Sequence, residues 1–211
     1  MKLPLLNFDG TKPSSIEISD KLIKSKINYK LIKFVIDWQL NHSKPRTAKT
    51  KQRNQIKGST KKIVAQKGSG GARHASKKAP IFIGGGVAHG PKGKVYRINK
   101  INKKVRKLAL VQTLSKKIID KKLYILADVK QEIKKTKEFN KFLEKNNLAN
   151  SLIISDNDTL KNIDKSARNI KNVKLIKTEG ANIYDIFKFK NVILTSSSVL
   201  KIQERLLNEK N

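Results

Sequence analysis

Three glycine-rich stretches have the residue types and spacing that come closest to phosphate-binding chemistry. Residues 68–73 (GSGGAR) and 84–89 (GGGVAH) offer backbone amides to a phosphate, but neither completes a G-x-G-x-x-G pattern between a strand and a helix. Gly85 and Gly90 have the spacing of a P-loop, yet Pro91 stands where that motif places its lysine. Nucleotide binding by these glycines is therefore a weak alternative.

The side chains that usually perform acid–base or metal chemistry are scarce in this chain. His42, His74 and His89 all lie between Asp37 and Asp120, an interval without a carboxylate, so neither a catalytic triad nor a metal site is supported there. We expect these histidines to stack on bases or to contact phosphates. The absence of cysteine excludes disulfides, zinc fingers and thiol catalysis.

One pair of carboxylates, Asp156 and Asp158, follows an apolar run as a catalytic pair could. A helix N-cap before Leu160 explains the pair better than catalysis does. Together with the incomplete phosphate motifs, this interpretation predicts that the protein is not an enzyme and has no catalytic residue, no cofactor and no bound metal. A nucleotide-dependent enzyme stays as a distant alternative.

Charge is the most informative property of the sequence. The 211 residues carry 48 Lys and Arg against 16 Asp and Glu, a formal net charge of +32. Of the basic residues, 22 fall in the acid-free interval between Asp37 and Asp120, and nine of the 11 glycines lie within residues 58–93. Such an excess of positive charge is normally offset by a polyanion, either a nucleic acid or an anionic membrane surface.

The composition of the basic segment favours folded RNA as that polyanion. No apolar stretch approaches the roughly 20 residues that a membrane span needs. Glycines let the backbone approach phosphates closely, and extended basic segments suit RNA that is recognised by its shape. Aromatic residues, which would stack on single-stranded bases, are limited there to Phe82 and Tyr96.

The elements that must position this segment lie on either side of it. Residues 3–8 form a short apolar run, and residues 15–18 alternate as a strand does. Apolar residues recur at helical spacing in residues 28–40 and again in residues 101–118. Four apolar runs follow, at residues 123–127, 152–154, 173–176 and 192–194. Helical patterns separate them around residues 139–143 and 160–170. A last helical pattern, around residues 199–206, follows the serines 196–198. Continuous apolar strands alternating with helices indicate a parallel sheet that is covered on both faces.

We therefore predict an α/β fold. A three-layer α/β/α domain with a mainly parallel sheet is built from residues 1–42 and 95–211, and a long extended basic loop, residues 43–94, is inserted near its N-terminus. A stretch of about 50 residues without periodicity does not belong inside a compact domain, so it projects from the domain or is disordered until RNA binds. The apolar cluster at residues 79–83 indicates that part of the loop packs against something.

Several motifs of the loop resemble one known family. The sequence has QKGSGGAR at residues 66–73, APIF at 79–82 and GGGVAHGP at 84–91, followed by NKK at 102–104 and a helix that contains Ala109 and Leu110. In these residues and along essentially the whole chain it resembles the bacterial type of the large-subunit ribosomal protein four family.

The resemblance implies a function and a location for each part. It implies a structural constituent of the large ribosomal subunit whose globular domain sits on the outer surface and whose loop penetrates the large ribosomal RNA. The loop tip lines a constriction of the nascent-peptide exit tunnel, and Lys67 occupies the family's tunnel-facing position near the macrolide site. Some members also repress translation of their own operon through messenger RNA.

The chain departs from the family pattern at the tip. The family usually has an aromatic and a basic residue where this chain has Val64 and Ala65, and arginine where it has Gly71. Both departures lower the charge and the stacking capacity of the tip.

These considerations define the expected site and partners. The residues expected to bind RNA are Lys44, Arg46, Lys49, Lys51, Arg53, Lys57, Lys61, Lys62, Gln66, Lys67, Gly68, Ser69, Gly70, Arg73, His74, Lys77, Lys78, His89, Lys92, Lys94, Arg97, Lys100, Lys103, Lys104, Arg106 and Lys107. The expected tunnel tip is Val64, Ala65, Gln66, Lys67, Gly68, Ser69, Gly70, Gly71 and Ala72. The expected partners are large-subunit ribosomal RNA, other large-subunit proteins and the nascent peptide, with no membrane and no small-molecule substrate.

The beginning of the sequence shows no long apolar region of a secretory signal, so we expect a cytoplasmic location in the ribosome. The alternative function is that of a nucleoid protein or RNA chaperone, which would use the same charge without specificity.

Overall fold

A six-stranded sheet organises the computed structural model, which describes residues 2–8, 15–19, 25–45, 47–93, 99–129, 132–133 and 135–207. The strand order is β2-β1-β3-β6-β4-β5. The strands are β1 (Lys2–Leu6), β2 (Ser15–Glu17), β3 (Leu123–Leu126), β4 (Ser151–Ser155), β5 (Val173–Lys177) and β6 (Asn191–Thr195). All neighbours are parallel except β2, which pairs antiparallel with β1 at the edge. The predicted mainly parallel sheet is thus confirmed.

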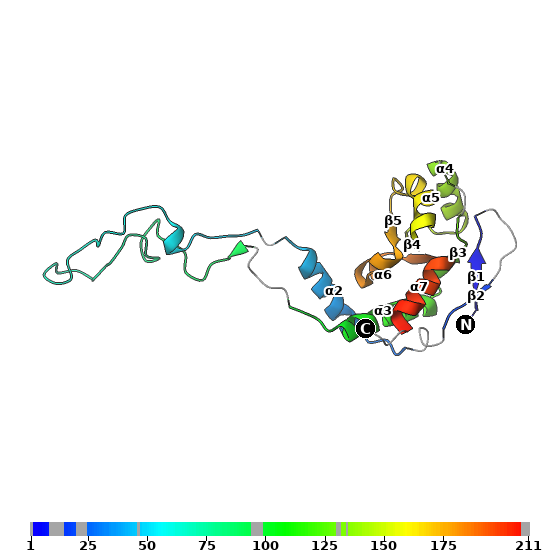
Figure 1. Cartoon of the computed structure of the whole chain (residues 1–211), viewed down its shortest axis with the longest axis horizontal. Coiled ribbons are helices and arrows are strands. Elements are labelled where there is room, and N and C mark those ends of the chain that lie inside the picture. The colour runs from blue at the N-terminus through cyan, green and yellow to red at the C-terminus, as the bar shows by residue number, and fades with distance from the viewer. Residues whose placement is uncertain are drawn as a thin grey trace. The chain divides into compact units, whose positions relative to one another are not determined.

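Helices cover both faces of this sheet because its central strands are apolar on both sides. Every residue of β4 and β6 is buried. Successive side chains of a strand point to opposite faces, so Leu152 and Ile154 enter one core while Ile153 enters another. The first core is closed by α2 (Tyr29–Ser43), α3 (Lys103–Ile119), α6 (Ile183–Lys188) and α7 (Ser196–Leu207), and the second by α4 (Thr136–Lys145) and α5 (Asn157–Ala167). The three predicted layers are therefore present, with α4 and α5 above the sheet in Figure 1.

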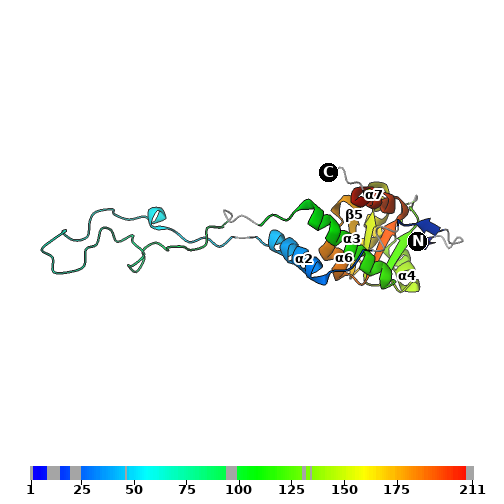
Figure 2. The ribbon, with the colours of Figure 1, turned by 90° about the horizontal axis from the view of Figure 1, so that it is seen from below.

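Helices α2 and α3 lie side by side and run in opposite directions (Figure 2). At one end, the backbone amide of Asn28 donates to Oε1 of Gln112 at 3.1 Å. At the other end, the guanidinium carbon of Arg106 lies 5.4 Å from the centre of the Trp38 ring. The parts of the two helices around Trp38 and Arg106 are consequently neighbours.

The segment that joins these helices forms a compact unit of its own. The chain divides into Met1–Leu40 with Lys100–Asn211, and Asn41–Asn99. Within the described part of the second unit, regular structure includes the end of α2, the short helix η1 (Arg53–Gln55) and an isolated bridge between Lys49 and Lys92. The predicted boundaries, 1–42 with 95–211 and 43–94, stay a prediction, as does ordering of the loop by RNA.

Backbone hydrogen bonds join the two limbs of the second unit. We call residues 49–63 the outgoing limb and residues 75–92 the returning limb. The amide of Thr50 donates to the carbonyl oxygen of Pro91 at 2.9 Å, and the amide of Val87 donates to that of Lys51 at 2.9 Å. Further along, the amide of Ile63 donates to the carbonyl oxygen of Ala75 at 3.2 Å. The limbs are therefore held together at both ends.

Among the described residues, no helix is long and apolar enough to span a bilayer.

Candidate nucleic-acid interface

Most of the predicted RNA-binding residues expose their side chains. In the second unit the exposed residues are Lys44, Lys49, Lys51, Arg53, Lys57, Lys61, Lys62, Gln66, Lys67, Gly68, Ser69, Gly70, Arg73, Lys77, His89 and Lys92, whereas His74 and Lys78 are half-buried. Arg46, Lys94 and Arg97 lie outside the described residues. Since no carboxylate occurs between Asp37 and Asp120, the unit presents a cationic surface that its own sequence does not neutralise.

The predicted tip falls where the chain reverses between the limbs. The bond between Ile63 and Ala75 is the last described backbone bond across the limbs, and the reversal follows it. Gly68 (φ +83°) and Gly70 (φ +65°) adopt the left-handed backbone conformation that favours glycine. Val64 is half-buried and residues 65–72 are exposed. Lys67 thus lies in the chain reversal that follows the outgoing limb and precedes the returning limb.

The triple glycine at residues 84–86 is a structural junction rather than a phosphate cradle. Two of its three amides are occupied, because Gly85 donates to the carbonyl oxygen of Phe82 at 2.9 Å and Gly86 donates to that of Lys78 at 3.0 Å. Gly86 is buried, and a Cβ atom there would stand 2.6 Å from Cα of Arg53. Only glycine therefore lets the returning limb pack this closely against η1.

The apolar cluster at residues 79–83 is only partly covered. Phe82 is half-buried and makes an edge-on contact with His74, whose ring centre lies 4.9 Å away. Ile81 and Ile83 on either side of it are exposed. The predicted packing is thus found for Phe82, and one side of the His74 ring is occupied within the loop rather than open to a base.

A second basic group lies at the beginning of α3, in the first unit. Lys103, Lys104 and Arg106 are exposed there and Lys107 is half-buried, while Lys100 is exposed just before the helix. Trp38 of α2 lies under the Arg106 guanidinium, a contact that orients this side chain. Sequence reasoning placed Trp38 in a core-facing stripe and missed this role. The residues three and four positions away from Trp38 in the sequence do not indicate that an arginine would pack on its ring.

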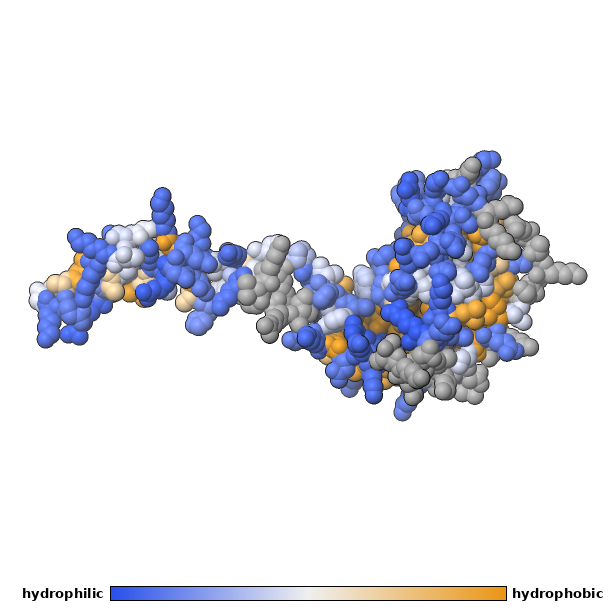
Figure 3. Space-filling view, viewed as in Figure 1, coloured by the Kyte–Doolittle hydropathy of each residue, from blue (hydrophilic) through white to orange (hydrophobic). Residues whose placement is uncertain are grey.

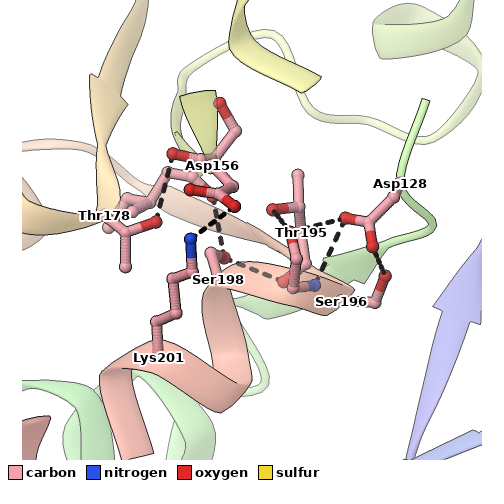
Figure 4. Close-up of polar contacts among 10 residues, drawn as sticks. Asp128, Asp156, Thr178, Thr195, Ser196, Ser198 and Lys201 are labelled. Atoms are coloured by element: carbon pink, nitrogen blue, oxygen red, sulfur yellow. Dashed lines mark hydrogen bonds and ion pairs between the residues drawn. The ribbon is translucent and has the colours of Figure 1, made fainter. Parts of the chain in front are cut away.

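The edge where parallel sheets usually bind ligands is filled by the protein's own polar groups (Figure 4). Asp128, which follows β3, accepts hydrogen bonds from Oγ of Ser196 at 2.6 Å and from the amide and Oγ of Ser197 at 3.2 and 2.9 Å. Its carboxylate caps α7 at the place where a phosphate would have to bind. This arrangement disfavours the nucleotide-dependent enzyme.

The acidic pair after β4 lies at the start of α5, as predicted, but the Asp156 side chain makes no capping hydrogen bond to that helix and pairs with a lysine of α7 instead. Asp156 stands at the N-cap position of α5, and Nζ of Lys201 donates to its Oδ2 at 2.6 Å (Figure 4). This hydrogen bond holds the pKa of Asp156 below its ordinary value. Within the described residues, no group of three or more His, Cys, Asp or Glu side chains could hold a metal ion.

The sequence model of the ribosomal protein L4/L1 family matches residues 16–205. The chain belongs to this family. A protein named large ribosomal subunit protein uL4 from Pelagibacter ubique is 48% identical over 206 residues, which cover 97% of this chain and 99% of that protein. Proteins of the same name from Desulforapulum autotrophicum and Geotalea daltonii are each 39% identical, over 95% and 97% of this chain and 96% and 98% of those proteins.

Membership in the L4/L1 family confirms the resemblance that the loop motifs indicated. The family is one of structural ribosomal proteins without enzymatic activity, in agreement with the prediction that this chain is not an enzyme. The match spans both units, so the basic segment is part of what the family model recognises.

Proposed function

We propose that this chain is a cytoplasmic structural constituent of the large ribosomal subunit, where its limbs bind large-subunit ribosomal RNA and residues 64–72 help line the nascent-peptide exit tunnel. One observation carries the proposal. Two limbs joined by backbone hydrogen bonds expose cationic side chains along their length in a chain of the L4/L1 family. A surface of this kind suits RNA that folds around it.

Binding follows from the charge and from the joined limbs. Each lysine or arginine that meets a phosphate releases condensed counterions, which supplies most of the favourable free energy. The bonds between Thr50 and Pro91 and between Lys51 and Val87 join the limbs, so limbs that keep these bonds lose less conformational entropy on binding. The basic start of α3 adds a second point of attachment on the α/β body.

The proposal extends to partners besides RNA. Other large-subunit proteins are expected to contact the α/β body, and the nascent peptide is expected to pass residues 64–72. Repression of the chain's own translation would use the same phosphate-binding surface on messenger RNA.

A charge reversal at the tip tests the tunnel function. Lys67→Glu places a negative charge among phosphates, whereas the control Lys161→Glu changes an exposed position on α5. Because many basic contacts share the binding, we expect both variants to assemble into large subunits. Only Lys67→Glu should change erythromycin sensitivity, measured as growth inhibition alongside the large-subunit content. Equal drug responses with normal subunits would contradict the tunnel function and leave RNA binding intact.

The alternative, a nucleoid protein or RNA chaperone, uses the same charge without a fixed position. It predicts removal by salt, because contacts to phosphates alone weaken steeply as salt rises. A ribosomal constituent should sediment with large subunits in a one-to-one ratio after a high-salt wash. Sub-stoichiometric sedimentation would favour the alternative.

A further inference from the structure

The two limbs enclose a groove of about 580 Å³ between residues 56–63 and residues 77–84. Beside it, Oγ of Ser76 donates to the carbonyl oxygen of Ser59 at 3.4 Å, and the Ile63–Ala75 backbone bond closes the end nearer the tip. Its volume lies within the range of sites that hold small ligands or single residues of a polymer.

Part of the groove lining is apolar, although the surrounding surface is cationic. Ile56, Ile63 and Ile83 line it, and Ile83 is fully exposed while the other two are half-buried. Figure 3 shows apolar surface among the hydrophilic side chains of this unit. These apolar side chains can contact the flat part of a ligand while the surrounding charges bind its polar groups.

Five lysines line the same groove: Lys57, Lys61, Lys62, Lys77 and Lys78. No carboxylate lies between Asp37 and Asp120, so the loop sequence supplies no counter-charge for them. Five ammonium groups around one groove favour an occupant that carries several anionic groups.

The combination of apolar lining and cationic rim distinguishes between forms of RNA. A paired helix keeps its bases stacked inside and presents phosphates on a convex surface, so it would leave the isoleucines uncovered. An unpaired nucleotide can turn out of the stack and offer a flat base to apolar side chains while its flanking phosphates stay outside. An acidic peptide would satisfy the lysines but gives no reason for the apolar lining.

We propose that this groove holds one unpaired nucleotide of the ribosomal RNA, with its base against Ile56, Ile63 and Ile83 and its flanking phosphates on the surrounding lysines. The assignment rests on the proposed RNA-binding function and adds a base-contacting site to it. It lies apart from residues 64–72, so it anchors the limbs rather than shaping the tunnel.

Two RNA hairpins and two isoleucine variants test the assignment. The hairpins are identical except that one carries a single unpaired adenosine within its stem, and binding to the full chain is measured at one fixed salt concentration. Burial of one base against aliphatic side chains predicts about tenfold tighter binding of the bulged hairpin by the unmodified protein. Ile83→Ser should abolish this preference. The control Ile81→Ser should keep it, because Ile81 is also exposed but does not line the groove.

The outcomes separate this proposal from the function on which it rests. Equal binding of both hairpins by the unmodified protein, or a preference that survives Ile83→Ser, would overturn the nucleotide site while RNA binding stands. Failure to bind either hairpin at low salt would overturn the proposed function and the site with it. A glutamate-rich peptide that displaces the bulged hairpin, and does so only when Ile83 is present, would identify a peptide groove instead.

Discussion

At the scale of single residues, Lys117 shows that the α/β body uses a cation for its own stability. Its side chain is buried, and Nζ donates to the carbonyl oxygens of Phe189 at 2.6 Å and Lys190 at 3.1 Å, beyond the end of α6. Burial lowers the pKa of Lys117, because the charged form loses hydration. These two bonds compensate for much of that loss.

Replacement of this lysine gives the first prediction. Lys117→Met keeps the apolar stem but leaves both carbonyl oxygens without their donor, which should lower the free energy of unfolding by about 1–3 kcal/mol. Urea denaturation measures the change. Lys116→Met is the control, since Lys116 pairs with Asp120 on the helix surface at 2.9 Å. A loss no greater than that of the control would show that the buried contacts contribute little.

The pair of Asp156 and Lys201 gives a prediction about pH. Their hydrogen bond lowers the pKa of Asp156 and raises that of Lys201. The Asp156 contribution to stability is present above the unfolded pKa and is lost as pH falls through the folded pKa. The Lys201 contribution is present below its unfolded pKa and is lost as pH rises through its folded pKa.

We therefore expect the unmodified protein to have a higher free energy of unfolding than Lys201→Met at neutral pH. The difference should be small, because the pair is near the surface. This difference should disappear in acid once Asp156 is protonated. Chemical denaturation at both pH values measures it, and Lys161→Met serves as the control. A difference that is the same at both pH values would show that the ion pair is not its source.

The sequence predicted which residues belong to the candidate site better than it predicted the contacts between them. The basic residues and the tip glycines were visible from composition and motif. The contacts of Trp38 with Arg106 and of His74 with Phe82 were not, because each joins residues that no periodic pattern connects. The reason for Gly86 was also hidden, since it depends on how closely Arg53 approaches from the other limb.

At the scale of elements, the strands and longer helices were predictable because burial on one or two faces leaves a period in the sequence. The four apolar runs after α3 became β3 to β6. The order of the sheet was not predictable, because β6 is inserted between β3 and β4 by contacts that no local pattern encodes. Helix α6 has 6 residues, too few for a recognisable period, and was missed.

The junction of the limbs gives a prediction at this scale. Gly86→Ala puts a methyl group 2.6 Å from Cα of Arg53 and 2.7 Å from the carbonyl carbon of Gln52, so the backbones must separate. Overpacking of this kind typically costs 1–3 kcal/mol, and we expect about tenfold weaker RNA binding. Gly71→Ala is the control, because a Cβ there has its nearest neighbour 4.0 Å away. Filter retention measures the RNA affinity of both variants, and the rate of trypsin cleavage within residues 49–92 shows whether the limbs separate. Equal affinity and equal cleavage of the two variants would contradict the close packing at Gly86.

At the scale of the whole molecule, the uneven charge predicts a steep salt dependence. If about eight loop cations meet phosphates, raising salt from about 50 to 200 mM should weaken RNA binding by roughly 10³ through counterion release. A titration of the full chain with ribosomal RNA at several salt concentrations gives the slope. Lys161→Ala, on α5, should leave that slope unchanged, and a nearly flat response of the unmodified protein would exclude phosphate contacts as the basis of binding.

The division of the chain also predicts what remains when the loop is removed. Ile32 and Val35 of α2 are buried in the same core as residues of α3, α6 and α7, so the N-terminal helix depends on elements that follow the loop. Because Trp38 of α2 lies beside Arg106 of α3, a short Gly-Ser linker can replace residues 44–99 without pulling the helices apart. The shortened chain should unfold in one cooperative transition and should lose most of its affinity for RNA.

Circular dichroism, which reports the helices, and tryptophan fluorescence, which reports the surroundings of Trp38, should give the same midpoint of unfolding for the shortened chain. Two separate midpoints would mean that the segments on either side of the loop do not fold as one body, since a shared core cannot melt in parts.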